Sequence, residues 1–199
     1  MIKHIITTEC QRSCSYCISK KINIEEADND LLAKKLPDLY WHLSMQHDSI
    51  MITGGEPTQA KAFSIYVNYA RQYFKKVFIT TQDEYLLGWK GSKRYFDAIT
   101  FSWHDLKTWR YAVTNEAVVY ASILSHLYSD WLVKTVKELG YAGLTINENH
   151  FATDAFDETL LPQIEGFSFK VNRRDECFNN STIYIMPDLS IHKSFEEFL

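Results

Sequence analysis

Short apolar runs rich in β-branched residues recur along the chain, and several of the segments between them repeat apolar residues at helical spacing. The runs begin near Ile2, Ser49, Lys76, Asp97, Ala117 and Gly143. Most intervals between them are long enough for a crossover connection and too long for a tight hairpin. The pattern therefore predicts an α/β fold with a parallel sheet, arranged as an open doubly wound sheet or as a partial barrel.

Three helices are expected between these runs. The first, over residues 32–43, contains Pro37, which predicts a kink or a split because proline lacks the N–H group that a helix interior needs. Thr58 is a candidate N-cap for the second helix, and Ser129 or Asp130 is a candidate N-cap for the third.

The pattern changes after about residue 149. Phe167–Val171 predicts one further strand, and residues 182–193 predict a small hairpin. Because no linker or low-complexity tract interrupts the chain, we expect one domain, with residues 1–150 as its core and residues 151–199 as a short C-terminal extension or cap.

Composition narrows the class of protein. The 199 residues are 46 % hydrophobic and 23 % charged, which is typical of a globular chain and excludes a disordered protein or a collagen. Because the net charge is -4 and the chain has no basic run, binding to duplex DNA through its phosphates is unfavourable. The sequence contains no long apolar span and no secretory signal, so we expect a cytoplasmic protein without a membrane segment.

Three of the four cysteines stand within eight residues, directly after the first predicted strand. Cys10, Cys14 and Cys17 have the spacing CxxxCxxC, and Cys177 is far away. In α/β folds, ligand sites gather at the carboxyl ends of the strands. An iron–sulfur cluster normally takes four cysteines, so a loop of three leaves the fourth iron to a remote ligand or open for chemistry.

Three other interpretations of these cysteines remain open. They could be small core residues on one face of a helix, because their spacing also fits a helical face. They could bind zinc, with His4 or Cys177 as the fourth ligand. A disulfide is also conceivable, although it would leave an odd cysteine.

A second motif, Gly54-Gly55-Glu56-Pro57, closes the second predicted strand. Glycines let a backbone approach a ligand closely, so Gly54 and Gly55 could present N–H and C=O groups to the carboxylate and ammonium of an amino acid. Glu56 adds a carboxylate that suits an ammonium. The alternative is an ordinary strand-to-helix turn.

Together, the cysteine loop and the glycine-rich turn resemble the radical S-adenosylmethionine (SAM) superfamily, over about Ile2 to Asn149. The resemblance implies a partial (β/α)6 TIM-like barrel and a [4Fe–4S] cluster held by Cys10, Cys14 and Cys17, with SAM on the open iron. It implies SAM contacts from Tyr16, Gly54, Gly55, Glu56, Pro57, Thr80, Ser102 and His104. Gln82 departs from the Thr-Asn-Gly turn that the family often has there.

The resemblance also implies an activity. Such enzymes reductively cleave SAM to a 5′-deoxyadenosyl radical, which abstracts hydrogen from a substrate, and an electron donor such as flavodoxin or ferredoxin is expected. One further thiol, Cys177, cannot build auxiliary clusters, so a minimal single-cluster enzyme is expected. Two minimal groups compare well: 7-carboxy-7-deazaguanine synthase, and the glycyl-radical activating enzymes that include the anaerobic ribonucleotide reductase activase. A non-catalytic metal- or cluster-binding module is the remaining alternative.

Candidate substrate contacts lie on the late strands and the tail. They are Glu148, His150, Lys170, Arg173 and Arg174. Cations beside hydrogen-bonding groups suit a polar, anionic small molecule such as a nucleobase, a pterin or a nucleotide. For each residue singly, a solvated charged surface is the competing interpretation. Because a short cap leaves the barrel open, either the substrate or the second subunit of a homodimer is expected to close it.

Overall fold

The computed structural model describes residues 1–14, 17, 24–104, 112–114, 116–148, 155–173 and 182–193. Within these residues the chain forms a nine-stranded sheet, in the order β7-β6-β5-β4-β3-β2-β1-β8-β9. The strands are β1 (Ile2–Ile5), β2 (Ser49–Thr53), β3 (Lys76–Thr81), β4 (Ala98–Ser102), β5 (Val118–Leu124), β6 (Gly143–Asn147), β7 (Ser168–Asn172), β8 (Ile183–Ile185) and β9 (Ile191–His192). Neighbouring strands are parallel, except for the antiparallel pair β8 and β9.

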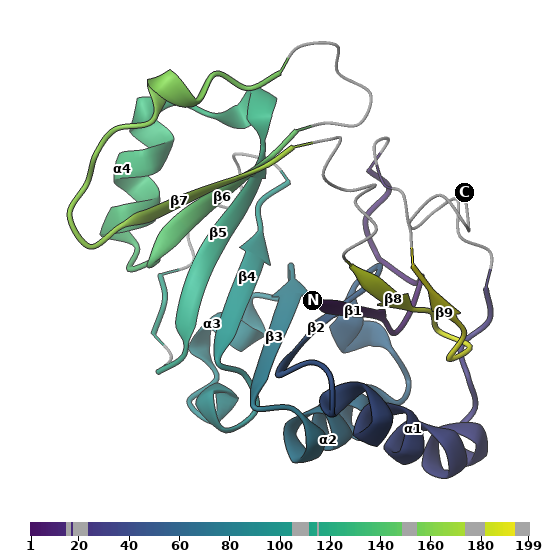
Figure 1. Ribbon diagram of the computed structural model, residues 1–199. Coiled ribbons are helices and arrows are strands. Elements are labelled where there is room, and N and C mark those ends of the chain that lie inside the picture. Colours follow the sequence, from purple (N-terminus) through teal and green to yellow (C-terminus); the bar gives the residue numbers. More distant parts are fainter. Residues whose placement is uncertain are drawn as a thin grey trace.

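The strand order distinguishes the two predicted architectures. Strands β1 to β7 stand side by side in chain order, so each crossover moves the chain in the same direction. A doubly wound sheet would instead reverse direction part-way. The sheet curves without closing, and its edges β7 and β9 are not paired with each other (Figure 1). The fold is therefore a partial TIM-like barrel, as the sequence predicted.

The helices lie on the outer side of this curved sheet (Figure 1). They are α1 (Asn29–Ser44), α2 (Phe63–Tyr73), α3 (Tyr85–Gly88) and α4 (Asp130–Glu138), with short 3₁₀ turns η2 (Pro57–Gln59), η3 (Ser92–Arg94), η5 (Ser125–Leu127) and η6 (Glu158–Leu160). Between β4 and β5 the described residues contain no helix. No helix in the described part of the chain is long and apolar enough to cross a membrane.

Of the predicted helix features, one is wrong, one is confirmed and one is decided in part. Helix α1 continues through Pro37 without a split, with Leu36 and Tyr40 fully buried, and a kink at Pro37 stays a prediction. Thr58 belongs to η2 and does not cap α2. The Ser129 hydroxyl accepts a hydrogen bond from the amide of Leu132 and caps α4, as predicted.

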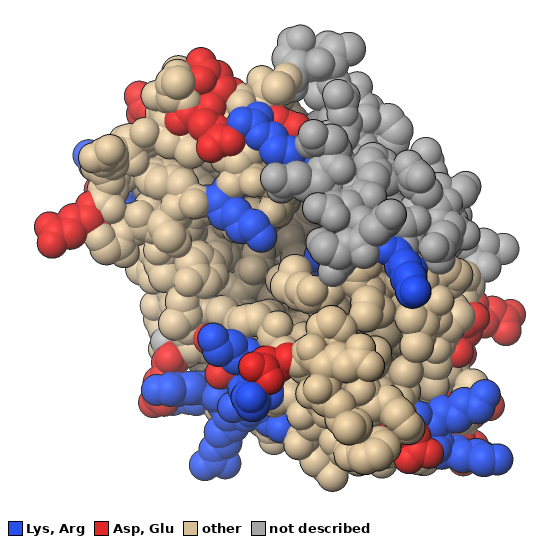
Figure 2. Space-filling view, viewed as in Figure 1, with Lys and Arg blue, Asp and Glu red and all other residues tan. Residues whose placement is uncertain are grey.

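Alternation along the strands separates two faces of the sheet. In β2 the buried residues Ile50 and Ile52 pack in the main apolar core, and in β4 Ile99 and Phe101 do the same. The alternate positions, such as Ser102, turn to the inner face and are less buried. The face shown in Figure 2 is hollowed near its centre, and most of the Lys, Arg, Asp and Glu side chains in this view stand around its margin.

The C-terminal segment contributes to both edges of the sheet. Strand β7 pairs with β6, and β8 pairs with β1 at the opposite edge. The predicted strand and hairpin are therefore confirmed, and in their described residues they extend the sheet. The division of the domain at residue 150 stays a prediction.

Candidate functional site

The carboxyl end of β1 runs directly against the turn that follows β2. The carbonyl oxygen of Thr7 accepts a hydrogen bond from the amide of Gly55 at 2.8 Å. The carbonyl oxygen of Glu9 accepts one from the amide of Glu56 at 2.7 Å. Because Cys10 follows Glu9, these bonds set where the cysteine loop begins relative to the glycine-rich turn.

The two glycines are required by this close passage. Gly54 has a φ of +151°, and a Cβ there would lie 2.4 Å from the carbonyl oxygen of Thr7. A Cβ on Gly55 would lie 2.2 Å from the carbonyl oxygen of Glu9. The two glycines therefore leave the space that the backbone of residues 7–9 occupies.

This arrangement uses two amide groups of the turn. The amides of Gly55 and Glu56 already donate to the chain itself, so they do not present donors to a carboxylate. A ligand at this turn would meet acceptors, which suits an ammonium group.

The Glu56 side chain is 2 % exposed and binds three neighbouring residues. Its Oε1 atom accepts hydrogen bonds from the Thr81 hydroxyl at 2.6 Å, from the Thr58 hydroxyl at 2.9 Å and from the Thr58 amide at 3.2 Å. Its Oε2 atom accepts a bond from the amide of Gln82 at 2.8 Å. Glu56 thus joins the turn after β2 to the end of β3.

The three clustered cysteines line one cavity of about 130 Å³ at the carboxyl ends of β1 to β4. Cys10, Cys14 and Cys17 are free thiols and partly buried. The residues that line the cavity with them are Arg12, Thr53, Gly54, Gly55, Glu56, Thr80, Thr81, Gln82, Ser102 and His104. The strand ends thus collect the cysteine loop and the glycine-rich turn in one place.

N–H groups point at the sulfur atoms. The side-chain amide nitrogen of Gln82 donates to Cys10 Sγ at 2.8 Å, and the backbone amide of Arg12 lies 3.4 Å from the same sulfur. The Nδ1 atom of His104 lies 3.9 Å from Cys14 Sγ. Such donors stabilise negative charge on a sulfur atom.

The structure removes or weakens the alternative interpretations of the cysteines. Residues 10–14 are not helical, so the cysteines do not share the face of a helix. The fully buried His4 bonds to the hydroxyl of Tyr40 at 2.7 Å and packs against Tyr66, within the core, so it is no zinc ligand here.

The three thiols could hold an iron–sulfur cube without meeting at one point. Among the described residues, no group of three His, Cys, Asp or Glu side chains converges on a point where one metal ion could sit. In a cube each cysteine binds a different iron, so the thiols need to share a cavity and need not meet at a point.

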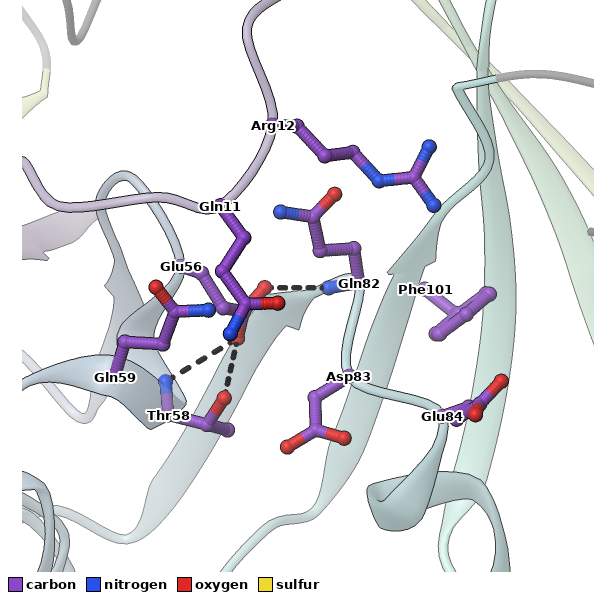
Figure 3. A pocket seen from close by; sticks show the side chains of 9 residues that line it. All are labelled: Gln11, Arg12, Glu56, Thr58, Gln59, Gln82, Asp83, Glu84 and Phe101. Atoms are coloured by element: carbon purple, nitrogen blue, oxygen red, sulfur yellow. Dashed lines mark hydrogen bonds between the residues drawn. The ribbon is translucent and has the colours of Figure 1, made fainter.

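Figure 3 shows the residues that line a second, larger cavity of about 480 Å³. The two share Arg12, Glu56 and Gln82. The other residues that line it are Gln11, Thr58, Gln59, Asp83, Glu84 and Phe101. Glu56 and Gln82 therefore lie at the boundary that the two cavities share.

Solved structures of SuiB from Streptococcus suis resemble the fold of this chain. SuiB superposes with a TM-score of 0.66 at 14 % identity, over 98 % of this chain and 60 % of that one. SuiB bound to S-adenosylmethionine gives 0.65 at 14 % identity, over 98 % and 58 %. SuiB bound to precursor peptide SuiA gives 0.60 at 13 % identity, over 96 % and 58 %.

This chain has the fold of SuiB, and that likeness agrees with the fold that the resemblance to the radical SAM superfamily implied. It spans about three fifths of the length of SuiB. No family model matches the sequence, and no curated protein is significantly similar to it.

This fold gathers most of the residues predicted to contact SAM. Thr80, Ser102 and His104 line the cysteine cavity with the glycine-rich turn. Pro57 begins η2 directly after the turn. Tyr16 lies outside the described residues, and the role of each residue toward SAM stays a prediction.

Sequence reasoning missed four residues of the cavity wall. Arg12, Thr53 and Thr81 were not singled out, and Gln82 was noted only as a departure from the family pattern. The position of two of these residues could have identified them. Thr81 ends β3 and Gln82 directly follows it, and ligand sites in folds of this kind gather at the carboxyl ends of strands.

The structure does not bring together the residues predicted to contact the substrate. Arg173 Nη1 donates to Glu148 Oε1 at 2.6 Å and to the carbonyl of Phe156 at 2.7 Å, and Arg173 also pairs with Glu158. Glu148 and Arg173 are therefore occupied with each other and with residues 156–158. The side chain of Lys170 is exposed on β7. His150 and Arg174 lie outside the described residues, as does Cys177.

Proposed function

We propose that this chain is a radical SAM enzyme in which Cys10, Cys14 and Cys17 hold a [4Fe–4S] cluster. The observation that carries the proposal is the single cavity, lined by all three thiols and the Gly54–Glu56 turn, at the carboxyl ends of β1 to β4. When bound, the cluster supplies the electron that cleaves SAM, and the resulting 5′-deoxyadenosyl radical takes hydrogen from a substrate.

The chain's own residues would orient SAM and enclose the reaction. The acceptor character of the glycine-rich turn favours the ammonium of the methionine moiety over its carboxylate. Ser102 ends β4 and His104 follows it; both line the cavity and would supply polar contacts for the nucleoside. The amides of Gln82 and Arg12 stabilise negative charge on Cys10.

The decisive experiment is anaerobic reconstitution with iron and sulfide. The wild-type chain is expected to bind one [4Fe–4S] cluster, seen by iron content and by its visible absorption. Replacing Cys10, Cys14 or Cys17 by Ala should abolish the cluster, because each supplies a thiolate. Cys177→Ala is the matched control and should keep the full iron content. A cluster that requires Cys177 would contradict the proposal.

Activity is tested by adding SAM and a strong reductant to the reconstituted protein. The expected products are 5′-deoxyadenosine and methionine, released slowly without substrate. Methyl transfer, with S-adenosylhomocysteine as the sole product, would contradict radical chemistry. A cluster without any SAM cleavage would favour the non-catalytic module.

For the substrate, we propose a small polar molecule on the inner face of the sheet. Ser122 stands opposite Ser102 in register, and Asn147 bonds to Ser122 Oγ at 2.8 Å and to the amide of Asn172 at 2.7 Å. This row of hydrogen-bonding groups continues from the cysteine cavity, and Lys170 stands on the same face. Uncharged amides and hydroxyls with one cation suit a nucleobase, a pterin or a nucleotide.

A peptide is the second candidate substrate. It is favoured by the likeness to SuiB, whose structure was solved with the precursor peptide SuiA. A panel of pterins, nucleotides, peptides and glycyl-radical proteins would be tested for stimulated 5′-deoxyadenosine release, with flavodoxin or ferredoxin as electron donor. Stimulation by a peptide or a protein alone would overturn the small-molecule assignment.

A further inference from the structure

Gln82 connects the cysteine loop to the glycine-rich turn through two different groups. Its backbone amide donates to Glu56 Oε2 at 2.8 Å, and its side-chain amide nitrogen donates to Cys10 Sγ at 2.8 Å. Seventy-two positions separate Gln82 from Cys10, so this contact exists only because the ends of β1 and β3 meet. In Figure 3 the Gln82 amide lies between the backbone of the cysteine loop and the Arg12 side chain.

The other end of the same amide has no partner. The Oε1 atom of Gln82 is buried and accepts no hydrogen bond from any described residue. A buried carbonyl oxygen without a donor costs about 1–3 kcal/mol, so such atoms call for an explanation. Gln82 lines both cavities, which places this acceptor where a ligand could supply the missing donor.

The charge state of the sulfur decides the orientation of the amide. A metal-binding cysteine is a thiolate, which accepts hydrogen bonds and cannot donate them. The nitrogen of the Gln82 amide must then face Cys10, and the carbonyl oxygen must face away from it. The vacant position thus calls for a ligand with an N–H donor.

We propose that Gln82 is a positioning residue with two tasks: its amide nitrogen stabilises the Cys10 thiolate, and its carbonyl oxygen receives the ammonium of the bound amino-acid moiety. This inference rests on the proposed function. The acceptor would act beside the Gly54–Glu56 turn, where the amides of Gly55 and Glu56 are used by Thr7 and Glu9 and the carbonyl oxygens of the two glycines are further acceptors. A charged ammonium binds such acceptors more strongly than a neutral donor does.

The test compares three variants by two readouts that need no turnover. Gln82→Met removes both hydrogen-bonding groups at similar size, whereas Gln82→Glu removes the N–H donor and keeps an acceptor. Gln59→Met is the matched control, because Gln59 lines only the neighbouring cavity and does not contact Cys10. The readouts are the midpoint potential of the reconstituted cluster and the equilibrium affinity for SAM.

Both Gln82 variants are expected to shift the midpoint potential to more negative values, because N–H donors to the sulfurs stabilise the reduced cluster. Gln82→Met should weaken SAM binding roughly tenfold, the usual effect of losing a hydrogen bond to a charged group. Gln82→Glu should keep most of the affinity, and Gln59→Met should change neither readout.

The outcomes separate this inference from the proposed function. A wild-type chain that assembles no cluster or binds no SAM overturns the proposed function, and this inference with it. A wild-type chain that does both, while Gln82→Met behaves like Gln59→Met, overturns only the role of Gln82. Equal losses of SAM affinity in Gln82→Met and Gln82→Glu would overturn the ammonium contact, and an unchanged potential would overturn the contact with Cys10.

Discussion

The hydroxyl of Thr81 donates a 2.6 Å hydrogen bond to the carboxylate of Glu56, and this bond joins the end of β3 to the turn after β2. Both side chains are 2 % exposed. The cavity wall on this side is thus built from a buried polar network, which cannot lose one member without leaving the others unsatisfied.

Glu56→Ala should therefore lower the free energy of unfolding by about 2–4 kcal/mol, because it leaves the hydroxyl of Thr81 and the amide of Gln82 without their acceptor. Urea denaturation of the cluster-free protein measures the change. Glu84→Ala is the control, since Glu84 is exposed, and should change stability by less than about 0.5 kcal/mol. Equal losses in the free energy of unfolding for both variants would contradict a structural role of the Glu56 carboxylate.

Gly55→Ala should prevent the cysteine loop from passing the turn. The added methyl would lie 2.2 Å from the carbonyl oxygen of Glu9, which is backbone and cannot swing aside. Iron content after anaerobic reconstitution and thermal unfolding are the measurements, and both are expected to fall. Gly88→Ala is the matched control, because the nearest atom to its added methyl is Thr114 Oγ1 at 3.6 Å, an ordinary contact. Full iron incorporation in Gly55→Ala would refute the proposed reason for the glycine.

His4 should make the fold sensitive to mild acid. Burial lowers the pKa of His4 from 6.5 to about 3, so the unfolded chain binds a proton there that the folded chain does not. Stability from this group is fully present above the unfolded pKa and falls as the pH drops from about 6.5 toward 3, by about 2 kcal/mol at pH 5. Urea denaturation at pH 7 and pH 5 measures the loss, which should be smaller in His4→Gln. An equal loss in the variant would show that other groups carry the pH dependence.

Arg173→Met should loosen residues 156–158 and leave SAM binding unchanged. Arg173 holds the carbonyl of Phe156 and orients Glu148, whose Oε1 atom accepts the Phe156 amide at 2.9 Å. Hydrogen exchange at the Phe156 amide should therefore become faster. Lys134→Met is the control, since its pairing with Glu138 at 3.9 Å is exposed. If hydrogen exchange at the Phe156 amide is unchanged and the substrate no longer stimulates 5′-deoxyadenosine release, Arg173 would again be favoured as a substrate contact.

The sequence by itself determined the strand positions, the cysteine loop and the glycine-rich turn. These features depend on residues close together in the chain, so local patterns such as the β-branched run at Ser49–Thr53 or the CxxxCxxC spacing carry them. The same holds for the Ser129 cap, whose partner is three residues away.

Tertiary structure alone decided what depends on partners far apart in sequence. Strand order distinguished a partial barrel from a doubly wound sheet, because both share the same alternation of strands and helices. The hydrogen bond between Gln82 and Cys10 and the ion pair between Arg173 and Glu148 form because parallel strands bring their carboxyl ends to one edge of the sheet. No local pattern encodes these pairings, since each is fixed by the register of the sheet and by the burial that makes an unpaired polar group costly.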